Sequence, residues 1–195
     1  MLVALITAPA DEPVTLAEAK AHLRIEHSLD DAFINTAITA ARQYAEQFCW
    51  RGFVTQTWER TLDAFPAEEF IALPKGNLAS ITSIIYTDEN GSAATLASSV
   101  YEADAVSVPG FARLKYDQDW PSARDHWNAV KVRYVVGWAD VASIPPAIKQ
   151  GMLLLIGHWY KNRESSVIGS LRDLPFGVES LWAPHRVWWR PPVAA

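Results

Sequence analysis

Histidine, cysteine and paired carboxylates are the side chains of this sequence that could carry catalysis or hold a metal ion. The histidines are scattered, and none forms the His-x-x-x-His or Cys-x-x-Cys spacing that is typical of zinc sites. The single cysteine, Cys49, excludes an internal disulfide, and its place at the end of an apolar helical pattern predicts a buried, inert thiol. The five histidines are His22, His27, His126, His158 and His185.

Three places in the chain resemble fragments of an active site. Asp30-Asp31 pairs two carboxylates, but acids at a helix N-terminus are explained by the helix dipole. Asp125-His126 comes without a nucleophile motif, so a loop with solvated charges is the better interpretation. His158 is more simply a structural histidine. We therefore predict no catalytic residue, no cofactor and no metal site, and an enzyme that uses His126 or His158 is the less favoured alternative.

Composition narrows the class of protein further. The chain has 195 residues, of which 50% are hydrophobic and 20% are charged, so it is long enough for one domain or two small ones. The net charge of −5 and the absence of a lysine or arginine run argue against a nucleic-acid-binding patch. Nine tryptophans suggest either an interaction surface or a tryptophan-rich core. The first residues, Met-Leu-Val-Ala-Leu-Ile, do not form a signal peptide, which predicts a soluble protein that stays in the cytoplasm.

The longest apolar helical pattern begins at Pro146 and reaches about Arg163. Proline is tolerated in the first helical turn, and the charged residues inside the run argue against a membrane span. The apolar stripe is wider than a helix facing a single core requires, so we expect part of it to contact another copy of the chain. The stripe consists of Ile148, Met152, Leu155, Ile156 and Trp159, widened by Leu153, Leu154 and Tyr160.

The remaining patterns predict an α+β fold. Thr15 and Glu18 form a capping box for a short helix, and a second helix with small alanines follows from about residue 28 to Gly52. Residues 53–140 alternate or turn as strands do, with Asn90-Gly91 as a hairpin signal. We expect a helical bundle of three main helices and a short C-terminal one, with an inserted antiparallel β module of about six strands. The predicted divisions are an N-terminal arm with helices (1–52), the β module (53–140), the main core helix (141–166) and a flexible connector with a C-terminal docking tail (167–195).

Aromatic and basic residues gather near the C-terminus. Tryptophan with arginine on an extended segment is typical of an interface anchor, because an exposed apolar patch usually has a partner. The alternative is a tail that folds back on its own core. We favour docking on a neighbouring protein through Leu181, Trp182, Arg186, Trp188, Trp189 and Arg190.

Several ordered motifs between residues 13 and 186 resemble the head–tail connector (adaptor) proteins of long-tailed phages and gene transfer agents. The resemblance departs at Trp182, where a second leucine would be expected, and at Trp188-Trp189-Arg190. The motifs are Pro13-Val-Thr15-Leu-Ala-Glu18-Ala-Lys20-Ala-His22-Leu23-Arg24, Asp30-Asp31, Ala41-Arg42-Gln-Tyr44-Ala-Glu46, Leu73-Pro74, Tyr86-x-Asp88-x-x-Gly91, Trp120-Pro121, Tyr134-x-x-Gly137-Trp138, Pro145 or Pro146 with Ile148-Lys149, His158-Trp159-Tyr160-x-Asn162-Arg163-Glu164, and Pro175-Phe176-Gly177-Val178 with Leu181, Pro184 and Arg186.

The resemblance implies a structural virion protein of the neck, assembled in the bacterial cytoplasm, with no membrane partner. It implies a homo-oligomeric ring of twelve copies between the portal protein and a stopper or tail protein, through which DNA passes without sequence-specific binding. A stopper or tail-completion protein is the alternative. A closed ring needs two different apolar faces on each chain. We expect those faces, and hence the subunit interface, at Ile34, Ile38, Ala41, Ala45, Met152, Leu155, Ile156, Trp159 and Tyr160.

Overall fold

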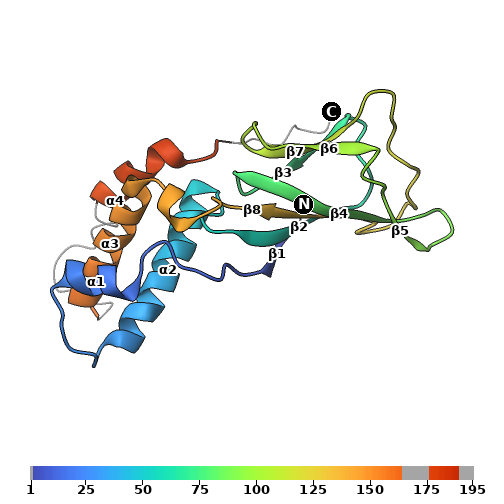
Figure 1. Cartoon of the computed structure of the whole chain (residues 1–195). Coiled ribbons are helices and arrows are strands. Elements are labelled where there is room, and N and C mark those ends of the chain that lie inside the picture. Colours follow the sequence, from blue (N-terminus) through green and yellow to red (C-terminus); the bar gives the residue numbers. More distant parts are fainter. Residues whose placement is uncertain (1, 164–175, 189–195) are drawn as a thin grey trace.

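The computed structural model describes residues 2–163 and 176–188. Helices gather at one end of an elongated molecule and strands at the other (Figure 1). The helices are α1 (Leu16–Leu23), α2 (Asp31–Cys49), α3 (Pro146–Lys161) and α4 (Phe176–Trp182), with single 3-10 turns at Val141–Ser143 and Ala183–His185. The strands are β1 (Leu2–Thr7), β2 (Gln56–Leu62), β3 (Phe70–Leu73), β4 (Leu78–Thr87), β5 (Ala93–Thr95), β6 (Tyr101–Asp104), β7 (Gly110–Leu114) and β8 (Val130–Val136).

The strands form two antiparallel sheets, which confirms the α+β class. One sheet has the order β1-β2-β8-β4-β5, and the other has the order β3-β7-β6. The number of strands differs from the sequence-based expectation, because residues 53–140 hold seven strands and the N-terminal arm adds β1 to the first sheet. The strand that escaped prediction inside the module is β5, whose three residues Ala93–Thr95 lack the alternation and bulk that mark a strand. The predicted division of the chain into four segments stays a prediction.

Local sequence signals explain where the helices begin and end. The Thr15 hydroxyl oxygen accepts a hydrogen bond from the Glu18 amide, and the Glu18 carboxylate accepts one from the Thr15 amide. The predicted capping box is therefore confirmed. Helix α2 ends at Trp50, whose left-handed φ of 56° lets the Trp50 and Arg51 amides donate to the free carbonyls of the last turn. None of the helices in residues 2–163 and 176–188 is long and apolar enough to cross a bilayer.

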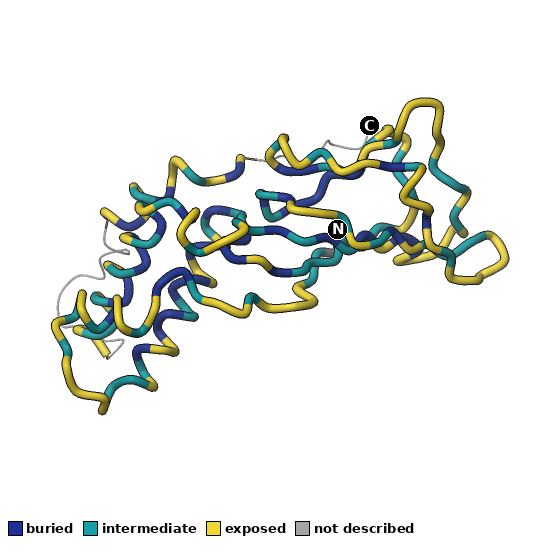
Figure 2. Tube along the Cα trace, in the orientation of Figure 1, coloured by how far each residue is buried: buried dark blue, intermediate teal, exposed yellow. Residues whose placement is uncertain are grey.

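Each half of the molecule has its own apolar core, visible as dark segments in Figure 2. The first core lies among the four helices, and the second lies between the two sheets. Strand β8 contributes Val130, Val132, Tyr134 and Val136 to the second core, as its alternating pattern predicts.

The two halves are joined by a buried ionic network at the end of α2. The Arg42 guanidinium donates to Glu12 of the arm at 2.8 Å and to Glu46, one helical turn later, at 2.9 Å. Glu46 also accepts from the Phe53 amide at 2.8 Å and from the Gln56 side chain at 2.6 Å. Arm, helix and first sheet are therefore held together by one set of charge-assisted hydrogen bonds.

Burial alone would shift the pKa values of both partners in this network. Desolvation raises the pKa of Glu46, although the Phe53 amide and the Arg42 charge act against it. Burial acts to lower the pKa of Arg42, but the hydrogen bond to Glu12 and the charge of Glu46 outweigh it, so the pKa rises. Each charge is stable in this interior only because the other is present.

Candidate docking surface at the C-terminal segment

The nine residues predicted to form a subunit interface are mostly core residues of the same chain. Seven have at most 2% of their surface exposed, because α2 and α3 turn their apolar faces toward each other and toward α4. The prediction is therefore wrong for Ile34, Ile38, Ala41, Ala45, Met152, Leu155 and Ile156. Trp159 and Tyr160 are half-buried and stay candidates. The apolar surplus of α3 is limited to those two residues, half-buried Leu153 and exposed Leu154.

Trp182 is also part of the core, which corrects its expected role in docking. Its side chain is fully buried, and its indole Nε1 donates to the Ile148 carbonyl at 3.1 Å. A Cβ on Gly151 would lie 2.3 Å from that nitrogen, so the glycine provides the space for the ring. The rings of Tyr44 and Phe48 lie 5.9 and 6.0 Å from the ring of Trp182. Trp182 therefore fixes α4 against α2 and α3.

The segment after α4 is fastened to the C-terminal end of α2. The last carbonyls of a helix lack intrahelical partners, and here the Cys49 carbonyl accepts from the Val187 amide at 2.9 Å. The Arg51 Nε donates to the His185 carbonyl at 2.6 Å, and the Val187 side chain is buried. These contacts bring the chain to the surface at Trp188, whose side chain is 78% exposed.

The exposed end of this segment forms a stacked arrangement that we call the C-terminal platform, made of Phe48, Arg186 and Trp188. The Arg186 guanidinium carbon lies 5.2 Å from the centre of the Phe48 ring and 4.5 Å from the centre of the Trp188 ring. These distances are in the range of cation–π contacts. Of the predicted docking residues, Arg186 and Trp188 are exposed, Leu181 is half-buried, and Trp189 and Arg190 lie outside the described residues.

Two further basic side chains, Arg51 and Lys75, lie near the platform. Burial, and then the nearby Arg51 charge, lower the pKa of His185. Burial also lowers the pKa of Arg51. Lys75 lies 4.5 and 4.6 Å from the rings of Trp50 and Trp58, and burial lowers its pKa. In a chain with a net charge of −5, this end of α2 is a local exception.

The residues that could do chemistry are dispersed. Cys49 is buried, which confirms that part of the prediction, and desolvation raises the pKa of its thiol to about 12. His126 and His158 are exposed, and each contacts a neighbour in its own loop or helix end. Within residues 2–163 and 176–188, no group of three or more histidine, cysteine, aspartate or glutamate side chains is arranged to hold a metal ion.

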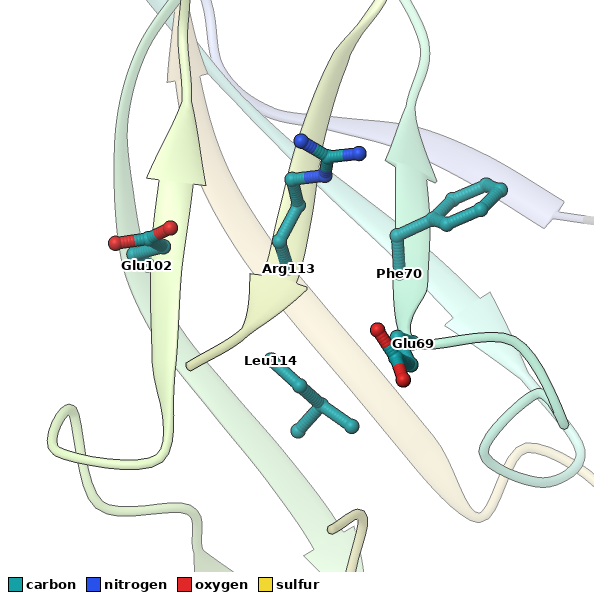
Figure 3. Close-up of a pocket in the computed structure, with 5 residues that line it drawn as sticks. All are labelled: Glu69, Phe70, Glu102, Arg113 and Leu114. Carbon is teal, nitrogen blue, oxygen red and sulfur yellow. The ribbon is translucent and has the colours of Figure 1, made fainter. Parts of the chain in front are cut away.

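A hollow of about 510 Å³ lies on the three-stranded sheet and is lined by charged side chains (Figure 3). Glu102 stands on β6, Arg113 on β7, and Glu69 directly before β3. Arg113 forms a 3.8 Å ion pair with Asp104, and its side chain is more than half exposed. Phe70 and Leu114 complete the lining, so the hollow offers charges but no serine, cysteine or histidine as a nucleophile.

Asp30 and Asp31, first considered as a carboxylate pair, serve separate structural contacts. Asp31 pairs with Lys20 of α1 at 2.7 Å. Asp30 accepts from the Tyr160 hydroxyl at 2.6 Å and pairs with Arg163 at 2.9 Å. The Arg163 guanidinium also stacks on the rings of Phe33 and Tyr160. The Asp30 contacts therefore join the start of α2 to the end of α3.

Replacing Asp30 with asparagine is expected to lower the unfolding temperature at pH 7. The difference in unfolding temperature between the variant and the unmodified chain should become smaller as the pH falls. The hydrogen bond from Tyr160 and then the pair with Arg163 lower the pKa of Asp30 in the folded chain. The stabilisation is thus complete above the unfolded value, about 3.9, and is lost as the pH falls through the folded value. Thermal unfolding between pH 7 and 2.5 measures it, with Asp125→Asn in an exposed loop as control. A difference that is independent of pH would contradict this role.

Residues 13–108 match a family model described as phage gp6-like head-tail connector protein. Over these residues, the chain is similar to the gp6-like head–tail connector family. The match spans α1, α2 and strands β2 to β6, so it includes parts of both halves of the fold. A comparison with curated proteins finds no match.

The connector fold is also found in solved structures of gene transfer agent (GTA) particles. Chains from the neck of an empty GTA particle, computed with C6 symmetry, and from the virion of a native GTA particle match with a TM-score of 0.76 at 20% identity. A chain from the neck of a native GTA particle, computed with C12 symmetry, matches with a TM-score of 0.72 at 18% identity. Each match covers 99% of both chains, so the shared fold extends over the whole molecule.

Proposed function

We propose that the chain is a structural adaptor that forms a ring between the portal and the stopper or tail protein in the neck of a phage or gene transfer agent particle. The observation that carries the proposal is the connector-family match, which coincides with a fold shared over its full length with neck chains. The proposed location is the particle neck, after assembly in the bacterial cytoplasm. We propose no enzymatic activity, cofactor or membrane partner.

The proposed ring has twelve copies, a number suggested by the C12 symmetry used for one of the similar neck structures. A ring requires each copy to present two different surfaces to its neighbours. Leu154, which is 37% exposed, and the half-buried Leu153 and Trp159 are the proposed apolar contacts on α3. The net charge of −5 suits a channel through which DNA slides, because phosphates are held by clusters of positive charge.

The proposed contact with the portal is the C-terminal platform, together with residues that follow it. Trp188 supports this assignment because its exposed ring lies 4.5 Å from the Arg186 guanidinium carbon, and tryptophan and arginine are enriched at protein interfaces. A truncation that tests docking should begin at residue 188, because a deletion that includes Trp182 would open the core of the helices.

The proposal is tested by mixing the full-length chain with assembled portal rings from the same particle and measuring the complex by native mass spectrometry. The account predicts a closed ring of the chain on each portal, even if the chain alone is monomeric. Assembled tail tubes serve as the competing partner. Binding to tail tubes without binding to portals would contradict the adaptor role and favour a tail-completion protein.

A further inference from the structure

In the part of the chain that the structure describes, Arg163 and Arg186 each lie over two aromatic rings, and only Arg163 pairs there with a carboxylate. Arg163 lies 4.9 and 4.7 Å from the ring centres of Phe33 and Tyr160, and it pairs with Asp30 at 2.9 Å. Arg186 lies 5.2 and 4.5 Å from the ring centres of Phe48 and Trp188. Among the residues that the structure describes, no oxygen accepts a hydrogen bond from the Arg186 guanidinium.

Stacking prepares a guanidinium to bind a carboxylate. Aromatic rings that pack on the faces of a guanidinium restrict its rotation and leave the N–H donors at its edge free. A carboxylate that approaches this edge can accept two parallel hydrogen bonds, and less side-chain entropy is lost than with a free arginine. The Arg163 site shows the completed arrangement within the same fold, and the Arg186 site shows it without the acid.

The charges near Arg186 favour an acidic partner. The neighbouring Arg51 donates hydrogen bonds to the His185 carbonyl and the Asn77 side chain. It therefore adds positive charge near Arg186, while the donors that it uses in these bonds are not available to a carboxylate of a partner. The closest acid on the same segment, Glu179, acts on Tyr44, whose pKa is raised first by burial and then by that charge. Glu179 forms no ion pair with Arg186.

We propose that Arg186 binds the carboxylate of an aspartate or glutamate on the protein that docks at the C-terminal platform, while an apolar group of that protein covers Trp188. This inference rests on the proposed function, in which the docking protein is the portal. A bidentate pair would fix the orientation of the segment, because two parallel hydrogen bonds define both distance and angle. The exposed tryptophan beside it would supply the apolar area and exclude water from the pair.

The experiment measures binding of the full-length chain to assembled portal rings at 50 and 300 mM salt. Arg186→Ala is expected to weaken binding by about tenfold at low salt, with a smaller effect at high salt. Arg186→Lys should recover only part of the loss, because an ammonium cannot form the two parallel bonds. Arg124→Ala, at an exposed arginine of the β module, serves as the matched control and should bind like the unmodified chain.

The acidic group is identified by replacing exposed aspartates and glutamates of the portal with their amides. One such change should reproduce the loss, and it should add little when combined with Arg186→Ala. If the unmodified chain binds portal rings and Arg186→Ala binds equally well, the carboxylate proposal is overturned and the adaptor role stands. If Arg186→Ala weakens binding to a DNA duplex and leaves portal binding unchanged, the partner is a phosphate and the proposal is also overturned. If the unmodified chain does not bind portal rings, the proposed function itself is contradicted.

Discussion

Replacing Trp182 with alanine is expected to lower the free energy of unfolding by about 3–5 kcal/mol, the usual cost of removing a buried large aromatic side chain. The ring is fully buried, and its Nε1 donates to the Ile148 carbonyl. Its removal takes away that hydrogen bond and opens a cavity between α2, α3 and α4. Chemical unfolding followed by circular dichroism measures the change.

Trp188→Ala is the matched control for this prediction. Its side chain is 78% exposed, so the same substitution should change the free energy of unfolding by less than about 0.5 kcal/mol. The two variants thus separate stability from docking, since we expect Trp188→Ala to lose portal binding and to keep its stability. Equal stability losses for the two tryptophans would show that α4 is not packed as described.

Replacing Arg42 with alanine should destabilise the chain by about 3–5 kcal/mol, because removing one partner of a buried ion pair leaves the other charge unpaired. Here two carboxylates depend on it, those of Glu12 and Glu46. Their side chains and that of Arg42 are at most 29% exposed. Guanidinium chloride unfolding of both variant and unmodified chain gives the difference.

The control is the surface pair between Arg133 and Glu59, with an oxygen–nitrogen distance of 2.8 Å and an arginine that is 42% exposed. Arg133→Ala should cost less than about 1 kcal/mol, since exposed ion pairs contribute little. A loss at Arg42 no larger than the loss at Arg133 would mean that the network does not join the helices to the sheet.

The sequence predicts the elements of this fold well where the signal is local. The capping box at Thr15, the turn at Asn90-Gly91 and the alternation of β8 each depend on residues a few positions apart, and all three are present. The split into two sheets and the strand at Ala93–Thr95 depend on pairing between distant residues. No local pattern reports such pairing.

The candidate site was harder to predict, because an apolar stripe does not show what covers it. Ile38 and Met152 belong to stripes that look alike whether the cover is the same chain or a neighbour, and here α2 and α3 cover each other. Gly151 was the missed signal, since a glycine inside a helical pattern often marks a close approach, here of Trp182. The sequence did not indicate Phe48 as a docking residue, because its contact with Arg186 depends on the path of the chain after α4.

We expected other subunits to cover the apolar surface of α3 and the tryptophan–arginine terminus. This expectation now applies to fewer residues. For α3 it applies only to Leu153, Leu154, Trp159 and Tyr160, and for the described part of the terminus it applies to Arg186 and Trp188. The family match, and not the amount of exposed apolar surface, now supports the assembly role.

The most direct test of that role is a density map of the neck of particles that carry this chain. The account predicts a closed ring of copies directly beneath the portal, with the indole of Trp188 in contact with the portal. A neck in which this chain is absent, or in which the portal meets another protein at that position, would contradict the account.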